Sequence, residues 1–193
     1  MTPKVAMILA AGLGTRLRPA TAKIAKPAVP VMNIPMLAYS MFYLEQIGVK
    51  HFVMNTHHLP ETVEKAARAC LSPYASLLLS HESPTILGNG GGIGKAKELL
   101  RKNLRAGDSF IVSNGDSVTI FDHPKFLSAA SLSHNKRNAI ATLVTCEHPK
   151  AGHEWPAVWI EPTTSAVIGF GKEAPRPGLK PVHYLGTQIL SER

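Results

Sequence analysis

The feature that most constrains this chain is a regular alternation of short apolar runs with helix-like segments between residues 4 and 146. Apolar runs predict strands at 4–10, 51–56, 75–81, 109–113 and 138–146, and helices are expected at 35–47, 60–71, 95–104 and 124–134. Such alternation favours right-handed crossovers and a parallel sheet covered on both faces. The pattern therefore predicts an α/β fold, a three-layer α/β/α sandwich with a mainly parallel, mixed sheet.

Beyond residue 150 the pattern changes to short β-like pieces at 157–161, 166–170 and 182–190, separated by breaks rich in proline and glycine. A chain of 193 residues is long enough for one domain that buries about 70% of the surface exposed when it is unfolded. We expect a single domain over residues 1–193, with a change of character between an N-terminal half, 1–122, and a C-terminal half, 123–193.

Charge and cysteine content narrow the choice of partner and compartment. There are 21 basic and 13 acidic residues, a net charge of +8, which favours anionic partners, and phosphates qualify as well as nucleic acid. Cys70 and Cys146 lie far apart and form no metal-ligand motif, which indicates a reducing compartment. No apolar stretch approaches the roughly 20 residues of a membrane-spanning helix. We expect a soluble, cytoplasmic protein without membrane contact.

Three polar or glycine-rich loops, 10–27, 82–94 and 114–119, follow predicted parallel strands, whose carboxyl ends are where α/β sheets bind ligands. The first loop places Gly12 and Gly14 where backbone N–H groups can approach a phosphate. The same loop adds four positive charges, on Arg16, Arg18, Lys23 and Lys26. It is therefore a candidate anion site.

Two better-known phosphate motifs are excluded. The dinucleotide pattern GxGxxG fits Gly12 and Gly14 but fails at Leu17. A Walker loop ending at Gly94 and Lys95 fails because Ala96 stands where a metal-binding hydroxyl is needed. Neither a nicotinamide-dependent dehydrogenase nor a P-loop ATPase is supported.

Residues 8–37, ILAAGLGTRLRPATAKIAKPAVPVMNIPML, closely resemble the signature LAAGxGTRLxPLTxxxPKPxxPVxxxPML of the sugar nucleotidyltransferases, the nucleoside-diphosphate-sugar pyrophosphorylases. The main departures are Ala20 and Ala25. Further similarity follows in order along the chain, in NTHHLPE, LGNGGGI, SNGDSV and HYLGTQILS at 55–61, 87–93, 113–118 and 183–191. The family has a Rossmann-like α/β/α fold, in agreement with the pattern of strands and helices.

The resemblance implies transfer of an NMP group from a nucleoside triphosphate, UTP or GTP being favoured, to a sugar 1-phosphate, with release of pyrophosphate. It implies that Arg16 grips the triphosphate, that Lys26 holds phosphate oxygens, and that Asp116 binds Mg²⁺, making these three the catalytic candidates. Lys172 would hold the sugar phosphate. The implied nucleotide-binding residues are Ala10, Ala11, Gly12, Gly14 and Thr15, with Gly90 and Gly91 against the nucleobase. Residues 1–122 would bind the nucleotide and 123–193 the sugar.

The chain departs from the family pattern in its second half. It has Pro156 and Ala157 where a Tyr-Gly pair is usual, and it ends before the stretch that carries a second metal-binding aspartate. We expect a truncated form whose exposed apolar surface favours a homo-oligomer. The alternative to an enzyme is a nonenzymatic nucleotide-binding or regulatory domain of the same fold. Nucleic-acid binding is not expected, because the basic stretch 95–105 lacks the aromatic residues that stack on single strands.

Overall fold

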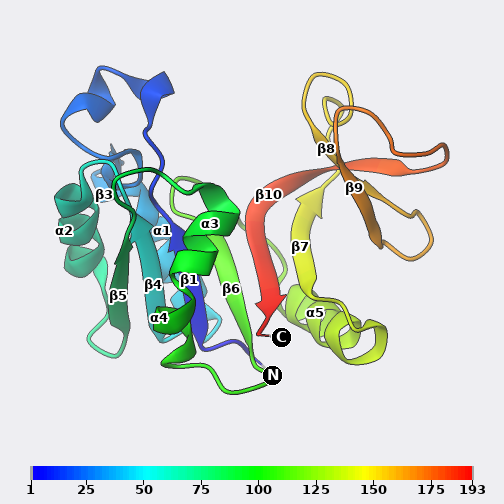
Figure 1. The fold of residues 1–193 in the computed structure, drawn as a ribbon, viewed down its shortest axis with the longest axis horizontal. Coiled ribbons are helices and arrows are strands. Elements are labelled where there is room, and N and C mark those ends of the chain that lie inside the picture. Colours follow the sequence, from blue (N-terminus) through cyan, green and yellow to red (C-terminus); the bar gives the residue numbers. More distant parts are fainter. Residues whose placement is uncertain (1, 193) are drawn as a thin grey trace. The chain divides into compact units, whose positions relative to one another are not determined.

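The computed structural model describes residues 2–192, which form two compact units (Figure 1). The first comprises residues 2–142 and 188–192, and the second comprises 143–187. We expected the chain to change character near residue 122, but the division falls inside strands β7 (Ala141–Cys146) and β10 (Lys180–Ser191). The assignment of one half to the nucleotide and the other to the sugar stays a prediction.

The first unit is built on four parallel strands in the order β5-β4-β1-β6. These are β1 (Val5–Leu9), β4 (His51–Thr56), β5 (Ser76–His81) and β6 (Ser109–Asn114). Leu9 pairs with Asn55 on one side and with Asn114 on the other. The three central strands therefore end at the same edge of the sheet.

Helices cover both faces of this sheet, which confirms the predicted layers. Val5 and Met7 pack against Ala96 and Leu100, at the junction of α3 (Gly88–Lys95) and α4 (Lys97–Arg101). The alternate side chains of β1 point to the opposite face. On that side α1 (Met36–Gln46) packs on β1 and β6, and it also contacts α2 (Pro60–Cys70).

Helix α5 (His123–Arg137) completes the first unit. The carboxylate of Asp122 caps its first turn by accepting a hydrogen bond from the N–H of Lys125. The last turn carries Lys136 and Arg137 and ends at Asn138, which has a left-handed backbone conformation. These are the start and stop signals expected of a helix, and they place it one to three residues beyond the predicted bounds.

The second unit contains antiparallel pairs. Strand β8 (Ala157–Ile160) lies between β9 (Val167–Gly171) and β10, and β7 also pairs with β10. Trp159 packs with Ala151 and Ala157 in a small core, and its ring N–H donates a hydrogen bond to the carbonyl of Gly171 at 3.0 Å. Parallel pairs in one unit and antiparallel pairs in the other make the predicted mixed pattern.

The predicted loop 82–94 is wrong over its glycine-rich part, because residues 88–94 form most of helix α3. At Gly92 the helix lies close against its neighbours. A Cβ on Gly92 would stand 2.6 Å from Oε1 of Glu82. The predicted helix 95–104 is accordingly divided, with α3 ending at Lys95 and α4 covering Lys97–Arg101.

The long loop after β1 also has structure that periodicity did not predict. It holds three short 3₁₀ helices, η1 (Thr15–Leu17), η2 (Ala20–Ala22) and η3 (Lys26–Ala28). A small hairpin of β2 (Pro30–Val31) and β3 (Ile34–Pro35) follows. These elements are too short to show a repeating apolar pattern.

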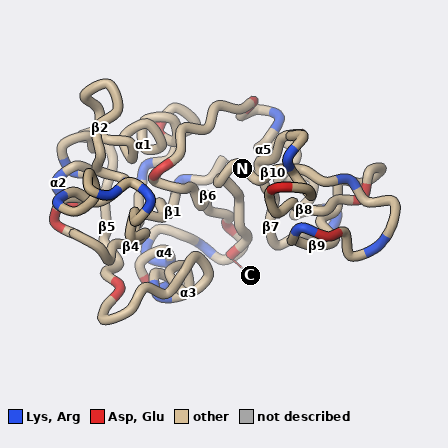
Figure 2. The backbone as a smooth tube through the Cα atoms, turned by 90° about the horizontal axis from the view of Figure 1, so that it is seen from above, with Lys and Arg blue, Asp and Glu red and all other residues tan. Residues whose placement is uncertain are grey.

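Basic residues occur along both units rather than in one continuous stripe, as the coloured tube of Figure 2 shows. Several are paired with carboxylates, such as Arg101 with Glu192 and Lys180 with Glu147. Within residues 2–192, no helix has the length and hydrophobicity needed to cross a bilayer.

Candidate functional site

A cavity of about 190 Å³ opens at the carboxyl ends of β1, β4 and β6. Its wall combines all three loops that the sequence singled out. The lining residues are Leu9, Ala11, Gly12, Lys26, Pro27, Asn55, Ile86, Gly88, Asn89, Asn114 and Asp116. The topology therefore produces the ligand-binding edge expected of an α/β sheet.

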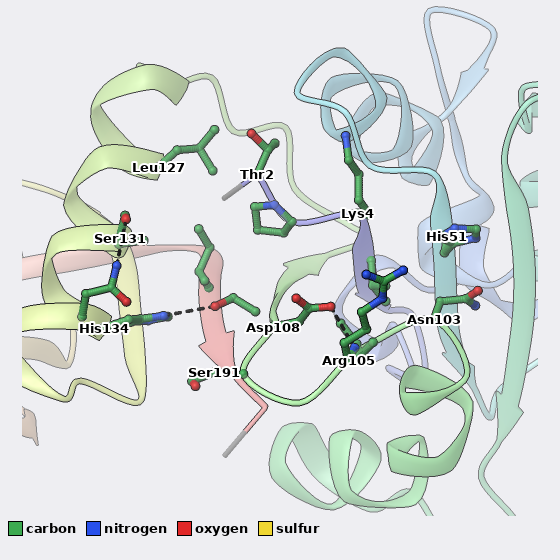
Figure 3. Close-up of a pocket in the computed structure, with 18 residues that line it drawn as sticks. Thr2, Lys4, His51, Asn103, Arg105, Asp108, Leu127, Ser131, His134 and Ser191 are labelled. Atoms are coloured by element: carbon green, nitrogen blue, oxygen red, sulfur yellow. Dashed lines mark hydrogen bonds between the residues drawn. The ribbon is translucent and has the colours of Figure 1, made fainter.

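A larger cavity of about 610 Å³ lies at the opposite edge, where β1, β4 and β6 begin (Figure 3). Thr2, Lys4, His51 and Asp108 are among its lining residues. It contains none of the residues predicted to bind nucleotide. By size alone, this cavity would be the candidate ligand site. Strand direction and the predicted residues instead indicate the smaller cavity.

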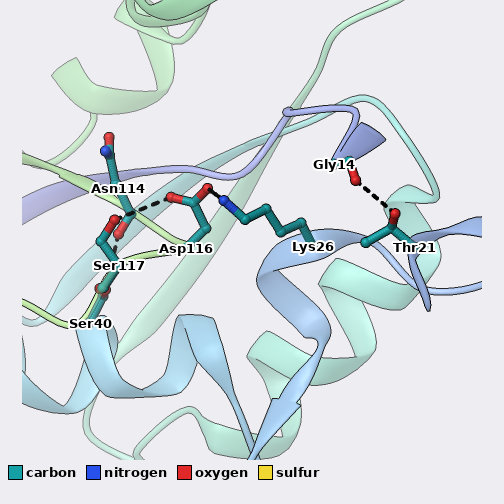
Figure 4. Close-up of polar contacts among 7 residues, drawn as sticks. All are labelled: Gly14, Thr21, Lys26, Ser40, Asn114, Asp116 and Ser117. Carbon is teal, nitrogen blue, oxygen red and sulfur yellow. Dashed lines mark hydrogen bonds and ion pairs between the residues drawn. The ribbon is translucent and has the colours of Figure 1, made fainter. Parts of the chain in front are cut away.

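Lys26 and Asp116 both line the smaller cavity, and their side chains contact each other (Figure 4). The Nζ atom of Lys26 lies 2.5 Å from Oδ2 of Asp116. The lysine side chain is 26% exposed and the aspartate side chain 30%, so both remain accessible from the cavity. A cation and a carboxylate that line one small cavity are side chains of the kinds that can hold a phosphate and a divalent metal ion.

Helix α1 holds the turn that carries Asp116. The hydroxyl of Ser40 lies 3.0 Å from the carbonyl oxygens of Asn114 and Ser117, which flank the aspartate, and donates to them (Figure 4). Between them, a Cβ on Gly115 would stand 2.9 Å from Cγ2 of Ile8. The turn can therefore lie this close to β1 only because residue 115 is glycine.

The loop that carries Lys26 is held by contacts within itself and to α2. The hydroxyl of Thr21 donates to the carbonyl of Gly14 at 2.8 Å, and Gly14 has a left-handed φ of 62°. The N–H of Ala25 donates to the hydroxyl of Thr62 at 3.0 Å. These bonds hold the backbone of the loop up to the 3₁₀ helix that begins at Lys26.

Four predicted site residues line the cavity together: Ala11, Gly12, Lys26 and Asp116. Ala10, between the lining residues Leu9 and Ala11, is 1% exposed, and its N–H donates to Oδ1 of Asn55 at 2.8 Å. The structure thus brings the end of β1, the basic loop and the aspartate turn to one place, as their sequence positions predicted.

Other predicted residues lie outside the lining of this cavity. Arg16 is exposed on η1, and no ion pair joins it to another residue within 2–192. Gly14 and Thr15 directly precede it, and Gly90 and Gly91 lie further along α3 than Gly88, which does line the cavity. Lys172 follows β9 in the second unit. The roles of these residues stay predictions.

The sequence reasoning missed several polar residues of the site: Asn55, Glu82, Asn89 and Asn114. Asn55 had a detectable signal, since it is a polar residue inside the apolar strand 51–56. Glu82 had none, because a glutamate after a strand is ordinarily solvated, yet it is fully buried. Among residues 2–192, no cluster of three or more His, Cys, Asp or Glu side chains is placed to hold a metal ion.

Similarity to known proteins covers most of the chain. A family model described as nucleotidyl transferase matches residues 5–153. The chain is 33% identical over 153 residues to a UTP–glucose-1-phosphate uridylyltransferase of Synechocystis, with 75% of this chain and 38% of the relative covered. It is 32% identical over 148 residues to a mannose-1-phosphate guanylyltransferase catalytic subunit beta of Danio rerio, with 76% of this chain and 40% of the relative covered.

Solved structures agree with the fold. HddC from Yersinia pseudotuberculosis superposes with a TM-score of 0.74 at 25% identity, covering 97% of this chain and 76% of that one. UDP-glucose pyrophosphorylase from Acinetobacter baumannii gives a TM-score of 0.76 at 20% identity, covering 98% and 74%, a likeness of fold alone. The chain spans about two fifths of the length of the two curated relatives described above. Because the family model covers well over half of its residues, the chain belongs to the nucleotidyl transferase family.

Proposed function

We propose that the protein transfers an NMP group from a nucleoside triphosphate, UTP or GTP being favoured, to a sugar 1-phosphate, releasing pyrophosphate. The observation that carries the proposal is the pairing of Lys26 with Asp116 at the cavity that Ala11 and Gly12 line. The uridylyl and guanylyl transferases to which the chain is similar support this substrate class.

Two features of the cavity support this reaction. A sugar 1-phosphate oxygen attacks the α-phosphorus, and both that oxygen and the leaving pyrophosphate are already ionised near neutral pH. Positioning and neutralisation of charge therefore matter more than proton transfer. The Nζ of Lys26 reaches the cavity from one wall as a point charge, and the backbone at Ala11 and Gly12 forms another.

Asp116 is suited to hold a divalent cation together with substrate phosphates. Mg²⁺ usually takes one or two carboxylates, keeps several waters and completes its shell with phosphate oxygens. Oδ2 of Asp116 contacts Lys26, whereas Oδ1 has one long contact, 3.4 Å from the hydroxyl of Ser117. The ion, when bound, would neutralise charge on the triphosphate. Asp116 would hold it, and Lys26 would be left to hold phosphate.

We also propose that Arg16 binds the triphosphate. It is exposed on η1, in the same loop that supplies Ala11, Gly12 and Lys26 to the cavity wall. A guanidinium is planar and permanently charged, which suits it to phosphate oxygens. Lys172, in the second unit, is proposed to hold the sugar phosphate.

The test is a pyrophosphate-release assay of the 193-residue chain with UTP, GTP and dTTP, each combined with glucose 1-phosphate or mannose 1-phosphate and Mg²⁺. We expect release with at least one pair and a loss of about 10²-fold or more in Arg16→Ala and in Asp116→Ala. Arg68→Ala, which removes an exposed arginine from α2, is the matched control.

Two results of this assay would count against the proposal. Wild-type rates in both Arg16→Ala and Asp116→Ala would remove the assigned mechanism. Tight triphosphate binding without pyrophosphate release from any pair would instead favour the nonenzymatic nucleotide-binding domain.

A further inference from the structure

Glu82 is a buried carboxylate to which the proposed reaction gives no role. It follows β5 directly, it is fully buried, and its N–H continues the sheet by donating to the carbonyl of Thr56 at 2.7 Å. No lysine, arginine or histidine forms an ion pair with it within residues 2–192. Burial of a carboxylate is costly unless its oxygens are well hydrogen-bonded, so its contacts indicate why it is there.

Both carboxylate oxygens accept hydrogen bonds from segments that form the cavity. Oε1 accepts from the amide Nδ2 of Asn55 at 2.7 Å, and Oε2 accepts from the N–H of Leu87 at 2.7 Å. Oδ1 of Asn55 in turn accepts from the N–H of Ala10. A continuous chain of bonds therefore runs from the end of β1, through Asn55 and Glu82, to the residue before α3.

Helix α3 also packs directly against Glu82 and Asn55. A Cβ on Gly92 would stand 2.6 Å from Oε1 of Glu82 and 2.8 Å from Nδ2 of Asn55. The helix is therefore in direct contact with the pair. Gly88 and Asn89, at the start of the helix, and Ile86 before it line the cavity together with Ala11 and Gly12.

We infer that Glu82 is a positioning residue that sets the spacing between two segments of the cavity lining, 11–12 and 86–89. Through Asn55 it orients the end of β1, which leads into the basic loop 10–27. Through Leu87 it orients the segment 86–89. This inference rests on the proposed function, in which a nucleoside triphosphate contacts both segments. Glu82 touches neither substrate nor metal.

The donors and acceptors make a sharp test possible. Asn55 and Leu87 both donate to residue 82, so Glu82→Gln, which keeps the shape but has one acceptor oxygen, must lose one of the two bonds. Asn55→Asp places two carboxylates against each other. The double variant, Glu82→Gln with Asn55→Asp, satisfies every group again. The introduced glutamine amide donates to one oxygen of the introduced carboxylate, and the N–H of Ala10 donates to the other.

We expect Glu82→Gln to raise KM for the triphosphate about tenfold, because one buried hydrogen bond that positions the cavity lining is lost. We expect kcat to change less than about twofold. The double variant is expected to restore KM. Glu61→Gln, an exposed carboxylate on α2 with the same loss of charge, is expected to match the wild type. A Glu82→Gln variant that lowers the melting temperature but leaves KM unchanged would overturn the inference, as would a double variant no better than the single ones.

A second measurement needs no nucleotide. Amide hydrogen exchange of the ligand-free chain should be faster at Leu87 or Ala10 in Glu82→Gln and return to the wild-type rate in the double variant. Unchanged exchange at both amides would refute the positioning role. Failure of the wild type to bind or turn over any triphosphate would count against the proposed function alone, so the two failures are distinguishable.

Discussion

Lys26 and Asp116, 90 residues apart in the sequence, form an ion pair with Nζ 2.5 Å from Oδ2. Each belongs to a different loop at the carboxyl edge of the parallel sheet, and each lines the same cavity. In the absence of substrate each neutralises the other. A triphosphate with its cation would offer both residues new partners of the opposite charge, so the pair can exchange one set of ionic contacts for another.

Replacement of Lys26 by methionine should impair catalysis far more than folding. We expect kcat/KM for pyrophosphate release to fall about 10²–10³-fold, because a charge directed at the phosphates is lost. The free energy of unfolding should change by less than about 1 kcal/mol, since the ion pair is partly exposed to solvent. Lys125→Met, at an exposed lysine on α5, is the control, and the two quantities are measured by steady-state assay and urea titration. Equal activity in the two variants would contradict the assignment of Lys26.

Ser40 should matter to activity although it lies on a helix behind the aspartate turn. Ser40→Ala removes the donor shared by the carbonyls of Asn114 and Ser117, which should cost about 1 kcal/mol of stability and loosen Asp116. We expect weaker Mg²⁺-dependent triphosphate binding by calorimetry. Ser128→Ala, at an exposed serine of α5, should leave binding and stability unchanged. Binding at wild-type strength in Ser40→Ala would show that α1 does not hold the turn.

Two glycines of α3 should respond in opposite directions to alanine. Gly92→Ala is expected to destabilise the protein by about 1–3 kcal/mol, because the new methyl would stand 2.6 Å from the buried Glu82 carboxylate. At Gly94 a Cβ meets nothing within 4 Å, so Gly94→Ala should stabilise by about 0.5–1 kcal/mol through helix propensity. Thermal unfolding of the two variants makes the comparison. Equal effects at the two positions would argue against close packing of α3 on Glu82.

Tyr184, on β10, should make the chain less stable at high pH. Burial raises the pKa of its phenol from 10.0 to about 12. Between these values the unfolded chain releases the phenolic proton while the folded chain keeps it, so this contribution to stability is complete below pH 10 and is lost as pH rises toward 12. Urea titrations at about pH 9 and about pH 11, on either side of the unfolded pKa, should show a smaller loss in Tyr184→Phe than in the wild type. An equal loss would mean that the phenol does not titrate with folding.

Periodicity predicted the elements well where they are long and regular. Strand β4 has the predicted bounds, 51–56, and α1 differs from its prediction by one residue at each end. It failed at α3, because five of eight residues in Gly88–Lys95 are glycine and intrinsic propensity opposes a helix there. Tertiary contact overrides that preference, since only glycine lets the helix lie on Glu82 and Asn55.

By itself the sequence determined the order of strands and helices, the family, and which loops carry basic and acidic side chains. The tertiary structure decided which of those side chains meet. Lys26 faces Asp116 because parallel pairing aligns Leu9 with Asn55 and Asn114, so the loops after β1 and β6 leave the sheet at one level. The burial of Glu82 also depends on the tertiary structure. Apolar periodicity reports only which face of one helix or strand is buried, and it does not reveal that Asn55, 27 residues away, donates a hydrogen bond to Glu82.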